Sequence, residues 1–317
     1  MMGRAAVKWI VVAAAGALLA PLALAVPPGK PSGTAEFVCM YRGIAAQHPD
    51  PKLRNPDYLA DKLCRRSAYF SEDYASARAS IDAAGTMFAA YFMINVRTHY
   101  IDAALKRALA DGATQVVILG AGYDSRAYRF REAYPQARFF EVDLPSTSAR
   151  KRERLAEVFG AVPDYVRYAP IDFGSQKLED VLPPLGYDPA QRTFFILEGV
   201  SMYVPEAGTG ATLDFIRGRS APGSRLVFDY LLRPVIERKF AGYYAADHLS
   251  FSVERIGEPY ITGWMPREAA AFLRKHGLAV VEDVGDRELL RRHLLGSDGK
   301  PDGRLLNWQR MVEARVP

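Results

Sequence analysis

A short apolar run that leads directly into a Gly-x-Gly turn constrains this chain more than any other feature. Residues 116–119 read Val-Val-Ile-Leu, and Gly120 and Gly122 follow at once. Such a run is typical of a strand buried on both faces, and glycines let the backbone turn tightly against a ligand. The pattern predicts the first strand and nucleotide loop of an α/β domain. It departs from the strict dinucleotide fingerprint, because Ser125 stands where a third small residue would pack.

A second predicted strand, residues 137–143, ends in an acidic side chain. Asp143 follows Gly122 by 21 positions, and a carboxylate there can accept hydrogen bonds from both hydroxyls of a ribose. Asp143 can also cap the helix predicted to begin near Pro145, since proline is favoured at the first helical position. The two roles are compatible.

Two further predicted strands each deliver an acid. Residues 165–171 precede Asp172 and Phe173, a pair that suits an adenine ring, because the carboxylate accepts from the exocyclic amine and the aromatic side chain covers the ring. Residues 193–197 end in Glu198. Ligands bind at the carboxyl ends of strands in open parallel sheets, so Glu198 is expected at the site; its alternative is a buried acid paired with a helix terminus.

These segments in order resemble class I S-adenosylmethionine-dependent methyltransferases of the leucine carboxyl methyltransferase family, in particular its bacterial branch. The resemblance spans most of residues 32–317. It rests on three phrases: Leu-Gly-Ala-Gly-Tyr-Asp-Ser-Arg-Ala-Tyr-Arg at 119–129, Phe-Glu-Val-Asp-Leu-Pro at 140–145, and Leu-Glu-Gly-Val-Ser-Met-Tyr-Val-Pro at 197–205. It implies an α/β, Rossmann-like sheet of seven strands with the last antiparallel, an N-terminal helical cap, and an insertion or lid after strand 5.

The resemblance also implies S-adenosyl-L-methionine as the cofactor and assigns roles to its binding residues. The loop with Gly120 and Gly122 faces the methionine part, Asp143 holds the ribose, and Asp172 with Phe173 holds the adenine.

Four more positions are carried over from the family. Arg97, on the helix before the first strand, matches an arginine that grips the cofactor carboxylate with two hydrogen bonds; its alternative is a solvated helix arginine. Arg42 matches the arm that folds over the cofactor. Glu198 lines the amino-acid end, and Tyr203 stands where the substrate pocket begins, with a core aromatic as its alternative.

Segment composition predicts three parts. Residues 1–26 form a hydrophobic N-terminal segment, residues 27–111 an arm and helical cap, and residues 112–317 the cofactor-binding domain. The remaining strands are expected at 224–230, 278–283 and 308–316, with a helix at 266–276. Aromatic residues in 232–262 predict a lid or substrate wall, or else the packing of an ordinary insertion.

The charges and the cysteines argue against several other functions. The formal net charge is +5, but the charges are dispersed, and the basic cluster at 150–154 includes an acid, so no nucleic-acid partner is expected. Cys39 and Cys64 lack Cys-x-x-Cys spacing and give no disulfide framework, so they are expected to be unpaired and fit a reducing compartment. Five scattered histidines give no metal-site spacing, and no required metal is predicted.

Residues 1–26 carry two basic residues, then an apolar run from Trp9 to Val26 that ends Ala-Leu-Ala. The segment is read as a secretory signal, as a membrane anchor that tethers the protein through residues 9–26, or as an upstream stretch that is not translated, with a start at Val26. Because S-adenosylmethionine is made in the cytoplasm, a cytoplasmic catalytic domain is favoured over export.

Methyl transfer is an in-line displacement that depends mainly on positioning and on exclusion of water. The acceptor is expected to be a carboxylate or hydroxyl oxygen of a small molecule or peptide end. A carboxylate needs no base, whereas a hydroxyl does, and His248 or Tyr203 is then the candidate.

Two other functions are kept as alternatives. An NAD-dependent oxidoreductase shares the sheet, but the only Tyr-x-x-x-Lys spacing, Tyr58 to Lys62, precedes the glycine loop. A non-catalytic S-adenosylmethionine-binding protein would keep the loop without turnover.

Overall fold

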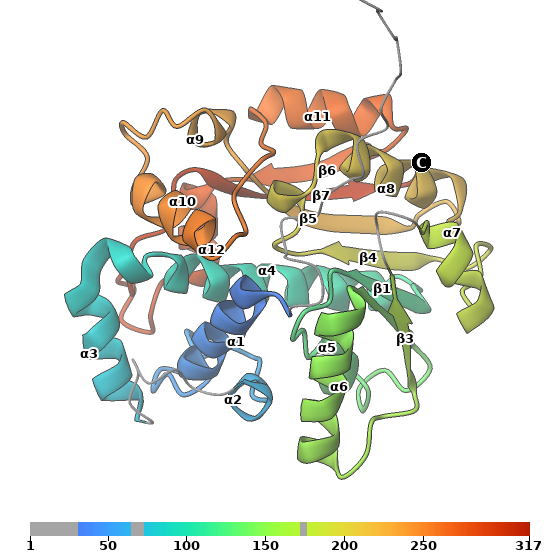
Figure 1. Ribbon diagram of the computed structural model, residues 1–317, viewed down its shortest axis with the longest axis horizontal. Coiled ribbons are helices and arrows are strands. Elements are labelled where there is room, and N and C mark those ends of the chain that lie inside the picture. The colour runs from blue at the N-terminus through green and yellow to red at the C-terminus, as the bar shows by residue number, and fades with distance from the viewer. Residues whose placement is uncertain (1–30, 65–72, 172–175) are drawn as a thin grey trace, which may run out of the picture.

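The computed structural model describes residues 31–64, 73–171 and 176–317. One mixed sheet runs through the molecule, with helices on both sides (Figure 1). Its strands are β1 (Gln115–Leu119), β2 (Arg138–Asp143), β3 (Val166–Pro170), β4 (Thr193–Leu197), β5 (Arg225–Leu231), β6 (Ala279–Val284) and β7 (Gln309–Arg315).

The strand order is β3-β2-β1-β4-β5-β7-β6. Strands β1 to β5 are parallel, and β7 pairs antiparallel with both β5 and β6. The predicted fold class, with seven strands and an antiparallel last strand, is therefore confirmed. The chain leaves β1 toward β2 on one side and returns to β4 on the other, so the carboxyl ends of β1 and β4 form the switch point where such sheets bind ligands.

Alternation along the strands builds a core on each face of the sheet. Val116 and Ile118 of β1 pack toward α4 (Ala90–Ala110), whereas Val117 and Leu119 point to the opposite face. That opposite face is covered by α7 (Leu178–Val181), α8 (Glu206–Gly218) and α11 (Pro266–Lys275). Both faces of β1 are buried, as a continuous apolar run requires.

The remaining helical elements lie before, between and after the strands. They are α1 (Gly33–Ala45), α2 (Ala60–Leu63), α3 (Tyr74–Ala84), η1 (Gly85–Phe88), α5 (Arg126–Arg129), α6 (Pro145–Phe159), η2 (Pro183–Leu185), η3 (Ser201–Tyr203), α9 (Arg233–Ile236), α10 (Ala246–Arg255) and α12 (Asp286–His293). The stretch before β1 is helical as predicted, but α4 packs on the sheet itself. The three-part division of the chain stays a prediction.

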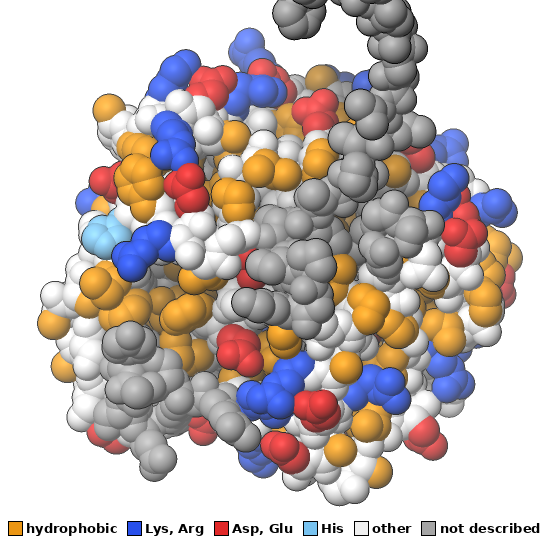
Figure 2. Space-filling model, in the orientation of Figure 1, with side chains coloured by type: hydrophobic (Ala, Val, Ile, Leu, Met, Phe, Trp, Pro, Cys, Tyr) orange, Lys and Arg blue, Asp and Glu red, His pale blue; other side chains and the backbone are white. Residues whose placement is uncertain are grey.

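None of the helices in the described residues combines the length and apolar character needed to cross a membrane. The segment 1–26, predicted as a signal, an anchor or an untranslated stretch, lies outside the described residues. On the face seen in Figure 2, basic and acidic side chains alternate rather than gather by sign.

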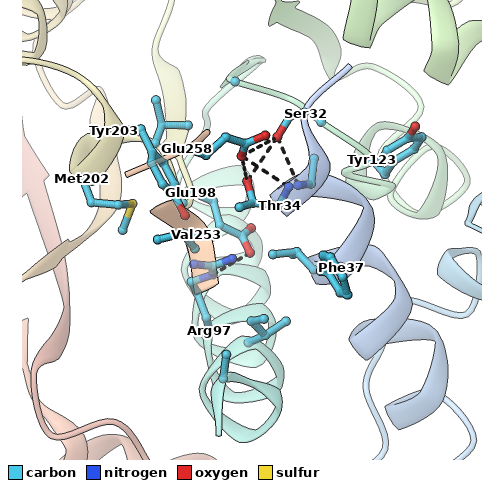
Figure 3. Close-up of a pocket in the computed structure, with 18 of the residues that line it drawn as sticks. Ser32, Thr34, Phe37, Arg97, Tyr123, Glu198, Met202, Tyr203, Val253 and Glu258 are labelled. Carbon is cyan, nitrogen blue, oxygen red and sulfur yellow. Dashed lines mark hydrogen bonds and ion pairs between the residues drawn. The ribbon is translucent and has the colours of Figure 1, made fainter. Parts of the chain in front are cut away.

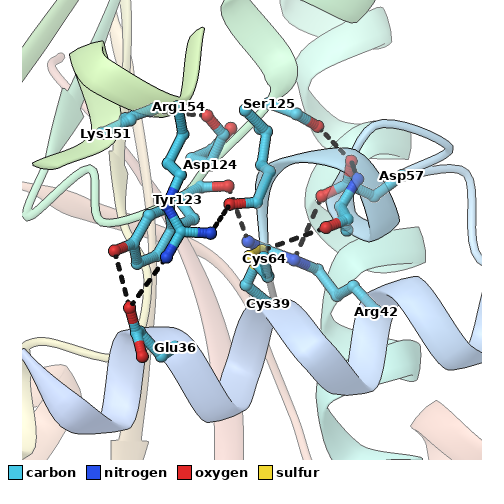
Figure 4. Close-up of a disulfide and its surroundings, with 12 residues drawn as sticks. Glu36, Cys39, Arg42, Asp57, Cys64, Tyr123, Asp124, Ser125, Lys151 and Arg154 are labelled. Atoms are coloured by element: carbon cyan, nitrogen blue, oxygen red, sulfur yellow. Dashed lines mark hydrogen bonds and ion pairs between the residues drawn. A yellow bond between two sulfur atoms is a disulfide. The ribbon is translucent and has the colours of Figure 1, made fainter. Parts of the chain in front are cut away.

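The expectation of two unpaired cysteines is wrong. Cys39 on α1 and Cys64, directly after α2, form a disulfide with their Cα atoms 6.0 Å apart (Figure 4). Twenty-five residues separate them in the sequence, and only the packing of α2 against α1 brings them together. A disulfide is typical of oxidising compartments, so the cysteines no longer support a reducing one.

Candidate functional site

A cavity of about 590 Å³ opens at the carboxyl ends of β1, β2 and β4. Its floor is the loop 120–124 after β1, together with Asp143 and residues 198–204. Helix α1 passes over one side, and residues 249–260, within and after α10, close another (Figure 3). Two segments from opposite ends of the chain thus enclose one site.

The glycine loop needs glycine at its first position. Gly120 has φ +66°, and a Cβ there would collide with the side chain of Val200. Gly122 has φ +45°. Both conformations favour glycine, and the absent side chains leave the loop backbone open to the cavity.

Asp143 lies at the end of β2 and binds the glycine loop. Its carboxylate accepts a hydrogen bond from the Gly122 N–H and another from the Leu144 N–H at 2.6 Å. Helix α6 begins at Pro145 as predicted, but Leu144 is its N-cap and no side chain caps it. Burial raises the pKa of Asp143 to about 6, against the lowering effect of the two N–H donors.

Glu198, one residue beyond β4, is held by arginines. Arg97 Nε donates to Oε1 at 2.9 Å, and Arg126 Nη1 donates to Oε2 at 2.6 Å. Arg42 Nη1 lies 3.9 Å from Oε1. Burial by itself would raise the pKa of Glu198, but the arginines outweigh it and hold that pKa well below its usual range. The alternative of a helix-terminus partner is not what the structure shows.

Arg97 is buried between two carboxylates rather than solvated. Besides Glu198 it binds Asp229 on β5, with Nη1 2.8 Å from Oδ2. Asp229 also accepts from the Gly199 N–H at 2.6 Å and from Gln309 Nε2 at 2.6 Å. Asp229 therefore holds the Arg97 guanidinium in place. Nothing in the sequence distinguished Asp229 from other strand residues.

Arg42, on α1, reaches from the arm into the floor of the cavity. Its Nη2 donates to the Tyr123 carbonyl at 2.9 Å, and its Nε lies 3.1 Å from Asp57 (Figure 4). The arm is thus tied to the loop after β1, three residues along α1 from the disulfide at Cys39.

Arg126 lies in the first of the three phrases shared with the family, and the resemblance assigned it no role. It is fully buried at the start of α5, and it pairs with Asp102 at 2.7 Å as well as with Asp124 and Glu198. Because a guanidinium holds its donors in a fixed planar arrangement, Arg126 ties the loop after β1 to Glu198 at the end of β4.

Tyr203, on η3, lines the cavity with its ring 5.4 Å from that of Tyr260. Burial raises the pKa of Tyr203 well above its usual value, and burial likewise raises that of Tyr260 to about 12. Both hydroxyls are protonated at neutral pH, so they are hydrogen-bond donors rather than bases.

The structure does not bring His248 to the cavity. It is exposed on α10, where Nδ1 lies 3.2 Å from Thr86 Oγ1, while its neighbour Leu249 lines the cavity. Asp172 and Phe173, predicted at the adenine, lie outside the described residues. Tyr58 is 61% exposed and, like Lys62, does not line the cavity.

Glu258, only 3% exposed, joins the two segments that enclose the cavity. Its carboxylate accepts from the Gly33 N–H at 2.7 Å, the Thr34 N–H at 3.3 Å and Ser32 Oγ at 3.2 Å, and also from Thr34 Oγ1 (Figure 3). It sits at the N-terminus of α1, where a negative charge is stabilised. No sequence pattern singled out Glu258, because its partners lie more than 220 residues away.

Residues 35–217, more than half of the chain, match the family described as leucine carboxyl methyltransferase. The chain belongs to this family. Two bacterial relatives in the comparison carry the name "Putative S-adenosyl-L-methionine-dependent methyltransferase". YktD of Bacillus subtilis is 30% identical over 61% of this chain and 63% of its own length, slightly under two thirds. SCO7813 of Streptomyces coelicolor is 34% identical over 74% of this chain and 82% of its own length.

This member of the leucine carboxyl methyltransferase family is an S-adenosylmethionine-dependent methyltransferase, and the predicted family, enzyme class and cofactor are confirmed. The oxidoreductase alternative is not favoured. Among solved structures, the magnesium protoporphyrin IX methyltransferase of Synechocystis, with bound SAH, is 13% identical with a TM-score of 0.44, over 71% of this chain and 84% of that one.

Proposed function

We propose that this enzyme transfers the methyl group of S-adenosylmethionine to a carboxylate oxygen of a small molecule or peptide end. A lone pair of the carboxylate attacks the methyl carbon, the sulfur–methyl bond breaks, and its electron pair stays on sulfur. An anion and a sulfonium give a methyl ester and a neutral thioether, so no proton is released.

The observation that carries this proposal is the make-up of the cavity lining, which offers no free base among the described residues. The described lining holds no histidine, lysine or cysteine, and each of its four carboxylates already accepts a hydrogen bond from an arginine or a backbone N–H; they are Asp124, Asp143, Glu198 and Glu258. Burial raises the pKa of Tyr203 and Tyr260, so both phenols are neutral at pH 7. A hydroxyl acceptor requires a base to take its proton, whereas a carboxylate is already ionised. The two phenols instead suit donation to the oxygen of the acceptor that does not react.

The cofactor roles follow the same geometry. We assign the ribose hydroxyls to Asp143 and the methionine part to the loop with Gly120 and Gly122. The anionic Glu198 suits the ammonium group of the cofactor. Arg97 keeps Nη2 without a hydrogen bond to any described residue, and that donor suits the cofactor carboxylate.

Cofactor binding and product chemistry test these assignments separately. Asp143→Ala is expected to cripple S-adenosylmethionine binding in calorimetry while the protein stays folded; unchanged affinity would refute the ribose assignment. For the acceptor, the enzyme is supplied with methyl-labelled cofactor and a panel of carboxylic acids and phenols. A labelled product that releases methanol in alkali, without proton release during turnover, is expected. An alkali-stable ether formed with one proton per turnover would overturn the carboxylate proposal.

A further inference from the structure

The cavity has two chemically different ends. Near the strands, its charged lining consists of two arginines, Arg42 and Arg97, and three acids, Asp124, Asp143 and Glu198, with Glu258 at the arm. The wall formed by α1, η1 and residues 249–256 is largely apolar, although Ser252 on α10 also lines it. Its apolar members are Phe37, Met87, Phe88, Leu249, Val253 and Ile256.

Nothing on the apolar wall can neutralise a charge. Arg42 and Arg97 are the only cationic side chains of the described lining. Arg42 is paired with Asp57, and Arg97 is paired with Glu198 at the end of β4. The four lining carboxylates outnumber them. A second negative charge on a bound molecule would therefore lie against hydrocarbon without a partner, which costs several kcal/mol.

The wall continues to the outer surface. Phe37 is 41% exposed, Met87 52% and Ile256 41%, and all three line the cavity. Figure 2 shows hydrophobic side chains gathered on the left of this face, over the region that α3 and α10 occupy in Figure 1. Exposed apolar side chains that rim a cavity mark the place where an apolar ligand enters.

We propose that the methyl acceptor is a hydrophobic monocarboxylic acid whose apolar body lies against this wall while its carboxylate meets Tyr203. The inference rests on the proposed carboxylate methylation and adds the substrate class. The product is the methyl ester of that acid, formed by the same balanced step, with the sulfur keeping the electron pair of the broken bond.

A homologous series of straight-chain acids, butanoic to decanoic, tests the wall by two independent readouts. The first is calorimetric binding of each acid to the enzyme loaded with S-adenosylhomocysteine, which needs no turnover. Each added methylene is expected to tighten binding by up to about 4-fold, the equivalent of about 0.8 kcal/mol. The second readout is kcat/KM for ester formation, which is expected to rise in parallel. Decanedioic acid is the matched control, and it is expected to bind far more weakly than decanoic acid.

Two variants locate the effect. Met87→Ser shortens a half-exposed wall residue, so the fold should survive, and it is expected to weaken decanoic acid binding about 4- to 10-fold, while butanoic acid changes little. Phe251→Ser is the control, because Phe251 is 46% exposed close to Val253 on α10 and does not line the cavity. It is expected to bind both acids as the parent enzyme does.

The outcomes separate the two proposals. If affinity and kcat/KM are flat or fall with chain length, or if the diacid equals the monoacid, the apolar-acceptor inference is overturned even where esters form. If binding tightens with length but no ester forms while a phenol is methylated, the carboxylate proposal fails and the apolar wall stands.

Discussion

Removing the Glu258 carboxylate should open the arm over the cavity. The carboxylate accepts two backbone N–H bonds and two hydroxyl bonds at the start of α1. Hydrogen bonds to a charged group contribute about 1.5–3 kcal/mol each, and a charge near a helix N-terminus adds about 0.3–1 kcal/mol. Water from the cavity can replace part of these interactions, so we expect Glu258→Ala to reduce the free energy that holds the arm closed by about 2–4 kcal/mol. Glu258→Gln keeps an acceptor oxygen and should reduce that free energy by about half as much.

The cost should appear as lost cofactor affinity, because Ser32, Thr34 and Arg42 of the arm line the cavity. A cost of about 2 kcal/mol weakens S-adenosylhomocysteine binding about 30-fold in calorimetry. Glu254→Gln is the control, since Glu254 is an exposed residue of α10 whose pair with Arg238 is a surface ion pair of little energetic value. If Glu258→Ala bound the cofactor and melted as the parent protein does, the inferred coupling between the arm and residues 249–260 would be refuted.

Three further perturbations test the site. The pKa of Asp143 is raised from 3.8 to about 6, so cofactor affinity should fall as pH drops through 6, and Asp143→Asn should abolish that dependence. Because Asp143 takes up a proton on folding, the free energy of unfolding should also fall as pH rises from about 4 to 6. Gly120→Ala should weaken cofactor binding tenfold or more, because the added Cβ meets Val200. Gly160→Ala is the control: it has open space around it, so it should lower stability by only the backbone cost of about 1–2 kcal/mol and leave cofactor affinity unchanged. Equal cofactor affinities of the two variants would contradict this. Dithiothreitol should lower the melting temperature, since the disulfide spans a 25-residue separation and such a loop is worth about 3.5 kcal/mol in the chain-entropy description. Identical melting with and without reductant would show that the bond contributes nothing.

Local sequence determined the sheet well. Residues 193–197 form β4 with the predicted bounds, and the other strands agree within one or two residues, because apolar runs bounded by turn residues carry their own periodicity. Asp143 and Glu198 could be placed at the cavity for the same reason, since each directly follows or ends such a run and the carboxyl ends of parallel strands meet at one edge.

Side-chain contacts between distant segments were not predictable. His248 lies on α10, and other residues of that helix line the cavity. Helical periodicity turns His248 toward Thr86 and solvent, while Leu249 points inward. Cys39 and Cys64 have no spacing that distinguishes a disulfide from two free thiols, and only the docking of α2 on α1 decided between them.

The sequence by itself thus determined the family, the cofactor and the edge of the sheet that carries the cavity, because these depend on residues close together in the chain. The tertiary structure alone decided how the site is closed. Glu258 holds the arm and Asp229 holds Arg97 across separations of more than 100 residues. The energy of such a contact depends on burial and distance, which arise only when the whole chain has packed.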